Sequence, residues 1–81
     1  MGKNEILAQI KESLIDILDK EDFDLTMGTT PADVEGWDSL AHFQLVMELQ
    51  EVYNIKIGAV AIQSWTKVGD IVETVLKSIN N

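Results

Sequence analysis

Apolar residues recur at helical spacing near the start of the chain. They stand three or four positions apart, which places them on one face of a helix; they are Ile6, Leu7, Ile10, Leu14, Ile17 and Leu18. Asn4 is a candidate N-cap, and the acidic stretch at residues 19–24 marks the end. The pattern predicts a first amphipathic helix of about four or five turns.

The periodic pattern stops between residues 23 and 37. This segment is rich in residues that favour turns, namely Thr26, Gly28, Thr29, Thr30, Pro31 and Gly36. A connection of this length inside a small domain is usually functional or folded against the core. We expect it to deliver the chain to Ser39.

Residues 40–53 are predicted to form the second helix, because the segment is long and contains neither Gly nor Pro. Asn54 suits the left-handed position that often ends a helix. One apolar stripe of this helix comprises Leu45, Leu49, Val52 and Tyr53, and another comprises Leu40, Phe43 and Met47. One stripe can face the core, and the other is either additional core or an exposed docking surface.

Two more helices are predicted after the short run at residues 55–57. Residues 58–63 permit a brief third helix, and Thr66 is the candidate cap of the last one. Its apolar residues keep helical spacing throughout and are Val68, Ile71, Val72, Val75, Leu76 and Ile79. Asp70 and Glu73 near its start complement the helix dipole. The sequence thus predicts one all-α domain over residues 1–81: a compact four-helix bundle with a short third helix and a long loop between helices one and two.

Composition narrows the class of function. The 81 residues contain no cysteine and one histidine, which excludes disulfides, thiolate metal sites and a histidine-built metal site. A net charge of −8 disfavours nucleic acid and anionic membranes as ligands and favours partners with basic patches. Because no apolar stretch is long enough to cross a bilayer, we expect a cytoplasmic protein. A monomer is the default expectation for a module that must dock reversibly. A small acidic chain fits an interaction module better than an enzyme.

Ser39 stands where the loop gives way to the second helix. If Asp38 is the N-cap, Ser39 is the first helical residue, and unpaired backbone N–H groups point outward beside its hydroxyl. A phosphodiester on that hydroxyl would lie at the positive end of the helix dipole. On spacing alone, an ordinary cap at Asp38 or Ser39 is the favoured interpretation, since capping Ser and Asp are common.

The neighbouring residues extend this pattern over most of the chain. The run Gly36, Trp37, Asp38, Ser39 and Leu40 is followed by the helical residues 45–51, a turn at 54–57 and the opening of the last helix at 66–70. Together these segments resemble the acyl carrier proteins. In that family the Asp-Ser-Leu motif opens the second helix, and its serine carries 4'-phosphopantetheine.

The resemblance implies a non-catalytic carrier with a covalent arm. It places 4'-phosphopantetheine from coenzyme A on Ser39, with Asp38 and Leu40 beside it. Implied partners are a phosphopantetheinyl transferase, an acyl- or aminoacyl-loading ligase or acyltransferase, and downstream synthase or transferase enzymes. An arm of this kind lets one tethered thioester visit several active sites at high effective concentration.

The resemblance also gives the second helix a role in partner recognition. Candidate contacts are Leu40, Phe43, Met47, Glu48 and Glu51, unless the apolar ones are core and the glutamates only solvate the helix. Ala41 and Gln44 stand where fatty-acid synthase carriers usually have acids, and Gln50 and Val52 interrupt the later glutamates. These departures favour specialised polyketide, fatty acyl or cell-surface biosynthesis. An aminoacyl or peptidyl carrier and an unmodified helical interaction module remain as alternatives.

Other groupings of residues are open to two interpretations. Ser39, His42 and Asp38 suggest a hydrolase, but adjacent turns of one helix rarely supply nucleophile, base and orienting group, so His42 is interpreted as packing beside the loop or the arm. The acidic residues Asp19, Glu21, Asp22 and Asp24 do not match a twelve-residue calcium loop, and no metal is expected.

Two further expectations concern the interior. Trp37 and Trp65 are expected to anchor loops to the core. By resemblance, an acyl chain could slip between the helices, and the candidate wall residues are Leu45, Leu49, Tyr53, Ile62 and Val68.

Overall fold

The first helix, α1, spans Lys3–Leu18 in the computed structural model, which describes residues 2–80. Its N-cap is Gly2, so the assignment of Asn4 as cap was wrong: Asn4 already lies inside the helix. The Glu5 carboxylate accepts the Gly2 N–H at 3.4 Å, which supplies the terminus with an acceptor three residues into the helix. At the other end Asp19 adopts the left-handed conformation, with φ of 52°.

The long connection is folded against the core, as predicted. It contains a short 3-10 helix, η1, at Pro31–Asp33. Leu25, Val34 and Trp37 are buried and anchor the connection to the helices. Most of the loop's path is therefore determined by packing.

The second helix, α2, spans Ser39–Tyr53, and Asn54 follows it in the predicted left-handed conformation, with φ of 53°. Leu45 and Leu49 are fully buried. Val52 was grouped with Leu45 and Leu49 on one stripe but does not share their burial, since 47% of its surface is exposed. The second stripe is exposed, with values of 65% for Leu40, 62% for Phe43 and 51% for Met47.

Two shorter helices complete the chain. The helix α3 spans Ala59–Ser64, and α4 spans Val68–Ile79. The N-cap of α4 is Lys67, so the assignment of Thr66 was one residue early. Thr66 acts instead as a donor, because its backbone N–H and its hydroxyl bond the Asp70 carboxylate at 2.9 and 3.0 Å. These two hydrogen bonds hold the pKa of Asp70 below its usual range, and the backbone bond has the larger effect.

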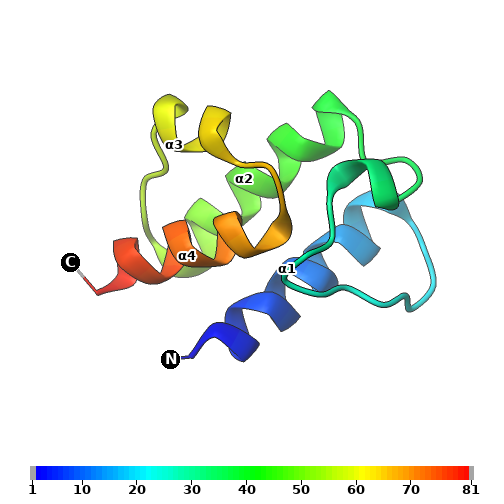
Figure 1. The fold of residues 1–81 in the computed structure, drawn as a ribbon, viewed down its shortest axis with the longest axis horizontal. Coiled ribbons are helices and arrows are strands. Elements are labelled where there is room, and N and C mark those ends of the chain that lie inside the picture. Colours follow the sequence, from blue (N-terminus) through cyan, green and yellow to red (C-terminus); the bar gives the residue numbers. More distant parts are fainter. Residues whose placement is uncertain (1, 81) are drawn as a thin grey trace.

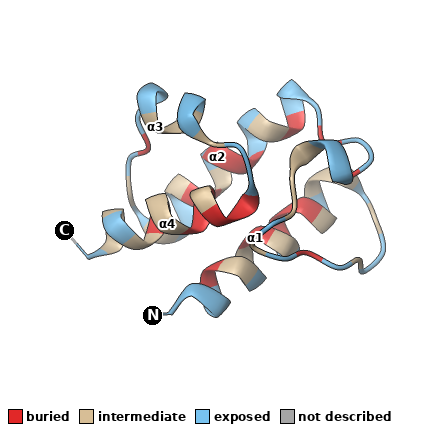
Figure 2. Cartoon of the chain, in the orientation of Figure 1, coloured by how far each residue is buried: buried red, intermediate tan, exposed pale blue. Residues whose placement is uncertain are grey.

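The helices form the predicted all-α bundle (Figure 1). The helices α1, α2 and α4 pack on one another, and α3 lies against α4. Figure 2 shows the buried residues concentrated on α1, α2 and α4, whereas α3 is mainly exposed or intermediate. None of the helices in residues 2–80 has the length and apolar character needed to cross a bilayer.

Candidate functional site

A tight turn before α2 sets the position of Ser39. Gly36 adopts a φ of +90°, a conformation that residues with a side chain rarely take. The Trp37 N–H bonds the Val34 carbonyl at 3.2 Å, and the Asp38 N–H bonds the Gly36 carbonyl at 2.9 Å. The turn therefore directs Trp37 into the core and leaves Asp38 in the extended conformation required of an N-cap.

Of the two candidate caps, Asp38 is the N-cap of α2, and the helix begins one residue before the predicted residue 40. Its side-chain Oδ1 accepts the Ala41 N–H at 2.9 Å, and its carbonyl accepts the His42 N–H at 2.9 Å. Ser39 is then the first helical residue and is exposed. The N–H groups of Ser39 and Leu40 belong to the first turn and have no acceptor within the helix, so they can serve an anion held at the Ser39 hydroxyl.

Two hollows meet at Ser39. One, of about 330 Å³, lies toward the loop and the α3–α4 turn and is lined by Pro31, Trp37, Asp38, Ser39, His42 and Trp65. The other, of about 410 Å³, is a groove between α2 and α3, lined by Ser39, His42, Phe43, Val46, Met47, Gln50, Ile57, Ala59 and Ile62. We call the first the tryptophan pocket and the second the α2–α3 groove. Ser39 and His42 line both.

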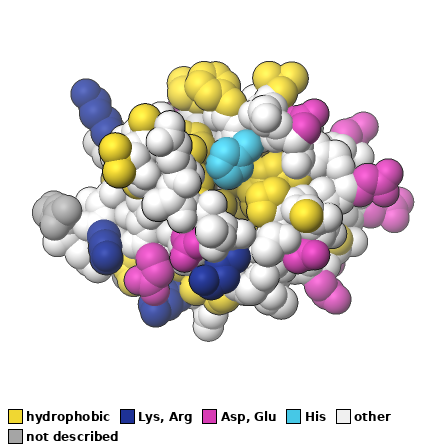
Figure 3. Space-filling view, turned by 45° about the horizontal axis from the view of Figure 1, so that its top comes forward, with side chains coloured by type: hydrophobic (Ala, Val, Ile, Leu, Met, Phe, Trp, Pro, Cys, Tyr) yellow, Lys and Arg dark blue, Asp and Glu magenta, His cyan; other side chains and the backbone are white. Residues whose placement is uncertain are grey.

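His42 packs between the two tryptophans. Its ring centroid lies 5.8 Å from that of Trp37 and 5.6 Å from that of Trp65, the latter pair being edge-to-face. The Trp37 Nε1–H donates to His42 Nδ1 at 3.0 Å. Burial lowers the pKa of His42 below its ordinary value. Figure 3 shows the histidine at the surface with apolar side chains on either side of it.

This geometry does not form a hydrolase triad. A general base for Ser39 needs an unprotonated nitrogen facing the hydroxyl, and His42 has its unprotonated Nδ1 bonded to Trp37. The Asp38 carboxylate faces the Ala41 N–H and does not orient the imidazole. His42 packs beside the loop, in agreement with the interpretation made from the sequence.

Each tryptophan of the tryptophan pocket donates one indole hydrogen bond, Trp37 to His42 and Trp65 to Thr74. Trp37 is 7% exposed. The Trp65 Nε1–H donates to Thr74 Oγ1 at 2.9 Å, and this hydroxyl donates in turn to the Asp70 carbonyl at 3.0 Å. Trp65 thereby connects the α3–α4 turn to α4, and both tryptophans anchor loops as expected.

The candidate recognition residues lie on one side of α2. Leu40, Phe43 and Met47 are the exposed apolar ones, Glu51 is exposed and Glu48 is half-buried. Ala41 is 5% exposed, so its difference from the usual acid changes the core and not the docking surface. The loss of surface charge just after Ser39 is therefore confined to the exposed Gln44.

The candidate wall residues for a sequestered chain are mostly not at the α2–α3 groove. Leu45, Leu49 and Val68 are fully buried core residues, and of the five candidates only Ile62 lines the groove. The sequence nevertheless contains a pattern from which the groove could have been predicted. Its residues on α2 follow Ser39 at helical spacing and are His42, Phe43, Val46, Met47 and Gln50.

The acidic residues after α1, namely Asp19, Glu21, Asp22 and Asp24, are all exposed. The Asp22 carboxylate pairs with the Lys11 ammonium at 2.7 Å, and the hydrogen bond and charge of Lys11 lower the pKa of Asp22. Within residues 2–80, no group of three or more His, Asp or Glu side chains is arranged to hold a metal ion.

Comparison with known proteins gives consistent relatives. No protein-family model matches the chain. The acyl carrier protein of Exiguobacterium sibiricum is 33% identical over 72 residues, which cover 89% of this chain and 91% of that protein. The acyl carrier protein of Phytoplasma australiense is 28% identical over 74 residues, covering 91% and 97%. The solution NMR structure of the holo acyl carrier protein from Geobacter metallireducens superposes with a TM-score of 0.83 at 30% identity, covering 91% of this chain and 85% of that one.

The all-α bundle superposes on that of a solved acyl carrier protein, so its fold is that of a carrier domain. The sequence identity and the coverage of the relatives then identify the protein family. The chain belongs to the acyl carrier protein family, and its role is that of a carrier protein.

Proposed function

We propose that this chain holds acyl intermediates as thioesters on a 4'-phosphopantetheine arm attached to Ser39 and presents them to partner enzymes in the cytoplasm. The main supporting observation is that the exposed Ser39 is the first residue of α2, at the point where the two hollows meet. The hydroxyl is accessible to a modifying enzyme, and the first-turn N–H groups favour the negative charge of a phosphodiester.

Attachment requires a phosphopantetheinyl transferase and coenzyme A. The Ser39 oxygen forms a bond to phosphorus, the pyrophosphate P–O bond of coenzyme A breaks, adenosine 3',5'-bisphosphate leaves, and the hydroxyl proton passes to the transferase. The bound arm supplies the terminal thiol that holds the acyl group, and this chain has no cysteine to compete for that group. The carrier itself is non-catalytic in this proposal.

Partner enzymes would dock on the exposed side of α2. Leu40, Phe43 and Met47 form an apolar surface that is bordered by the acids Glu48 and Glu51. An apolar centre with a charged rim suits an interface that must form and release, because the rim charges are screened by salt. The neutral and exposed Gln44 on α2 supports partners in specialised biosynthesis, which include a loading ligase or acyltransferase and downstream synthase or transferase enzymes.

Intact-protein mass spectrometry after incubation with coenzyme A and a broad-specificity phosphopantetheinyl transferase tests the proposal. The wild type should gain one phosphopantetheinyl mass, and Ser39→Ala should gain none. Ser64→Ala is the matched control, because Ser64 is also exposed but lies at the end of α3, outside both hollows. An unmodified but folded wild type would overturn the proposal in favour of an unmodified interaction module. Loading of holo protein by an aminoacyl-adenylating ligase and by no acyl ligase would favour an aminoacyl carrier.

A further inference from the structure

The hydrogen bond between Trp37 and His42 determines where the imidazole carries its proton. An indole N–H can only donate, so the His42 Nδ1 that receives it at 3.0 Å must be unprotonated. The neutral ring then carries its proton on Nε2. Within residues 2–80, no hydrogen bond engages that nitrogen. Since no buried side-chain nitrogen or oxygen there lacks a partner, Nε2 is not a buried atom. His42 thus offers an available N–H donor one helical turn from Ser39.

The tryptophan pocket combines this donor with apolar surfaces. Pro31, Trp37 and Trp65 supply rings from three separate segments: η1, the turn before α2 and the α3–α4 turn. Each tryptophan is fixed by its own indole hydrogen bond, to His42 and to Thr74. Both indole rings of the pocket wall are therefore fixed by hydrogen bonds within the protein, so the pocket needs little rearrangement to receive a ligand.

Position restricts what can occupy the pocket. Ser39 is part of its wall, so any group esterified to that hydroxyl begins at the pocket's edge. The first segment of a phosphopantetheine arm after the phosphate is the pantoyl unit, which has two methyl groups on one carbon followed by a hydroxyl and an amide. The methyl groups match the aromatic and proline rings, and the oxygens match an N–H donor.

We infer that the tryptophan pocket binds the pantoyl segment of the arm on Ser39, with the His42 Nε2–H donating to one of its oxygens and the Trp37 and Trp65 rings packing on its methyl groups. This inference rests on the proposed function. His42 is a positioning residue here: it directs the arm to one side of α2, and the α2–α3 groove stays free for the cargo.

Isotope-filtered NMR of the holo protein tests the inference. Apo protein labelled with ¹³C and ¹⁵N and then loaded from unlabelled coenzyme A carries an unlabelled arm, so contacts between arm and protein are selected cleanly. The expected result is NOEs from the two pantoyl methyl groups to the Trp37 and Trp65 rings, with both methyl signals shifted upfield relative to those of the same holo protein unfolded in urea. The His42 ring nitrogens should show the Nε2–H tautomer before and after loading.

A variant tests the contribution of His42. His42→Phe keeps a ring between the tryptophans but removes both the Nε2–H donor and the Nδ1 acceptor of the Trp37 N–H, and it should weaken the NOEs and move the methyl signals toward their unfolded positions. Gln44→Ala is the control, because Gln44 is exposed on the same helix and lines neither hollow. Should His42→Phe fail to fold, the wild-type NOEs still decide the question.

The outcomes of the two proposals are distinguishable. A protein that accepts no arm overturns the proposed function. A holo protein whose methyl signals match the unfolded reference, or whose NOEs go to Met47 and Ile62 in the α2–α3 groove, overturns the pocket assignment while the carrier function stands.

Discussion

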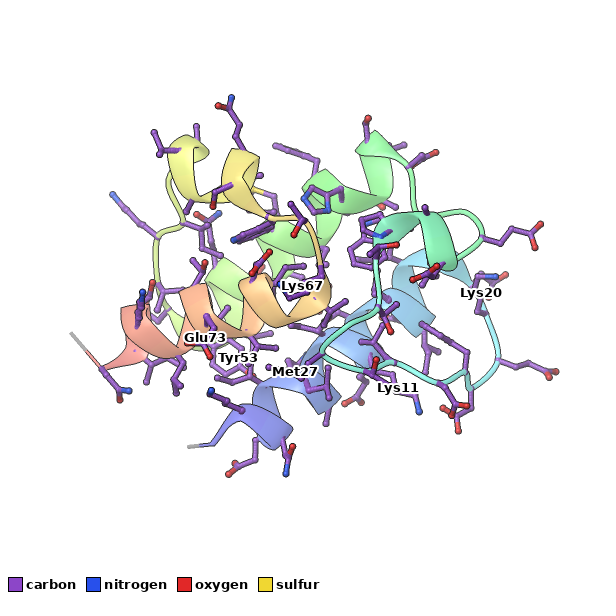
Figure 4. The ribbon with its side chains drawn as sticks, in the orientation of Figure 1. Lys11, Lys20, Met27, Tyr53, Lys67 and Glu73 are labelled. Atoms are coloured by element: carbon purple, nitrogen blue, oxygen red, sulfur yellow. The ribbon has the colours of Figure 1, made fainter. Side chains whose placement is uncertain are left out.

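The Gly69 N–H donates to the Met27 carbonyl at 2.7 Å, which joins the long loop to the first turn of α4. Figure 4 shows Met27 on the loop close to the start of α4, where Lys67 is labelled. The adjacent Val68 N–H bonds the Thr29 carbonyl at 2.8 Å. Two N–H groups of a helix terminus that lack helical acceptors are thus satisfied by the loop. The loop that precedes Ser39 is thus fixed to the first turn of the last helix.

Replacing Gly69 by Ala should destabilise the protein, although Ala is normally the better helix former. A Cβ at this position would lie 2.9 Å from the Met27 carbonyl oxygen, which is backbone and cannot rotate away. We expect a loss of about 1–3 kcal/mol in the free energy of unfolding, measured by urea denaturation. Gly28→Ala is the control, since its Cβ would meet only Thr26 Oγ1 at 3.9 Å. A Gly69→Ala protein as stable as the wild type would show that this contact is not tight.

The Asp38 cap gives a second prediction about stability. Asp38→Ala removes the acceptor of the Ala41 N–H and should lower the free energy of unfolding by about 0.5–2 kcal/mol. Asp38→Asn keeps a capping oxygen and should retain most of that stability. Thermal unfolding of the two variants followed by circular dichroism separates the cap from the charge. Equal losses in both variants would mean that the negative charge, and not the hydrogen bond, stabilises α2.

The sequence was most informative where the chemistry is local. The cap at Asp38, the start of α2 at Ser39 and the left-handed Asn54 all follow from neighbouring residues. The predicted N-caps of α1 and α4, Asn4 and Thr66, were wrong because each terminus offers several polar candidates. The acids three residues inside the two helices, Glu5 and Asp70, were the better signal, since both carboxylates accept backbone N–H groups from the cap.

Features that depend on distant segments could not be predicted from spacing. Val52 shares a helical face with Leu45 and Leu49, yet burial also requires another element to reach the last turn of α2. The tryptophan pocket needs η1, the turn before α2 and the α3–α4 turn to converge, and nothing in the order of residues indicates that Trp65 meets His42. The close approach of Met27 to Gly69 is of the same kind.

Protonation of His42 should reduce stability at mildly acidic pH. Burial lowers the pKa of His42 in the folded protein below its ordinary value. As the pH falls below about 6.5, the unfolded chain takes up the proton first, so the free energy of unfolding falls until the lower folded pKa is passed. The protonated ring also cannot accept the Trp37 N–H. Urea denaturation at stepped pH measures this loss.

His42→Gln supplies the reference for that measurement. The carboxylates of the chain are the same in both proteins, so the difference between the two stability curves isolates the imidazole. The difference should change between about pH 7 and the folded pKa, and be flat above that range. A difference that is constant across the whole range would contradict the lowered pKa. In the folded protein, the indole N–H resonance of Trp37 should shift only as the pH passes the lower folded pKa of His42.

Docking on α2 is tested by truncating an exposed apolar residue that lines neither hollow. Leu40 meets this condition and is 65% exposed, so Leu40→Ala should leave the free energy of unfolding nearly unchanged. If Leu40 is an anchor for partners, the variant should reduce kcat/KM of the phosphopantetheinyl transferase by about tenfold, which corresponds to about 1.4 kcal/mol. Val52→Ala, on the same helix, is the matched control. Equal rates for both variants and the wild type would place the transferase on another surface, whereas equal losses would indicate that truncation anywhere along α2 perturbs the helix.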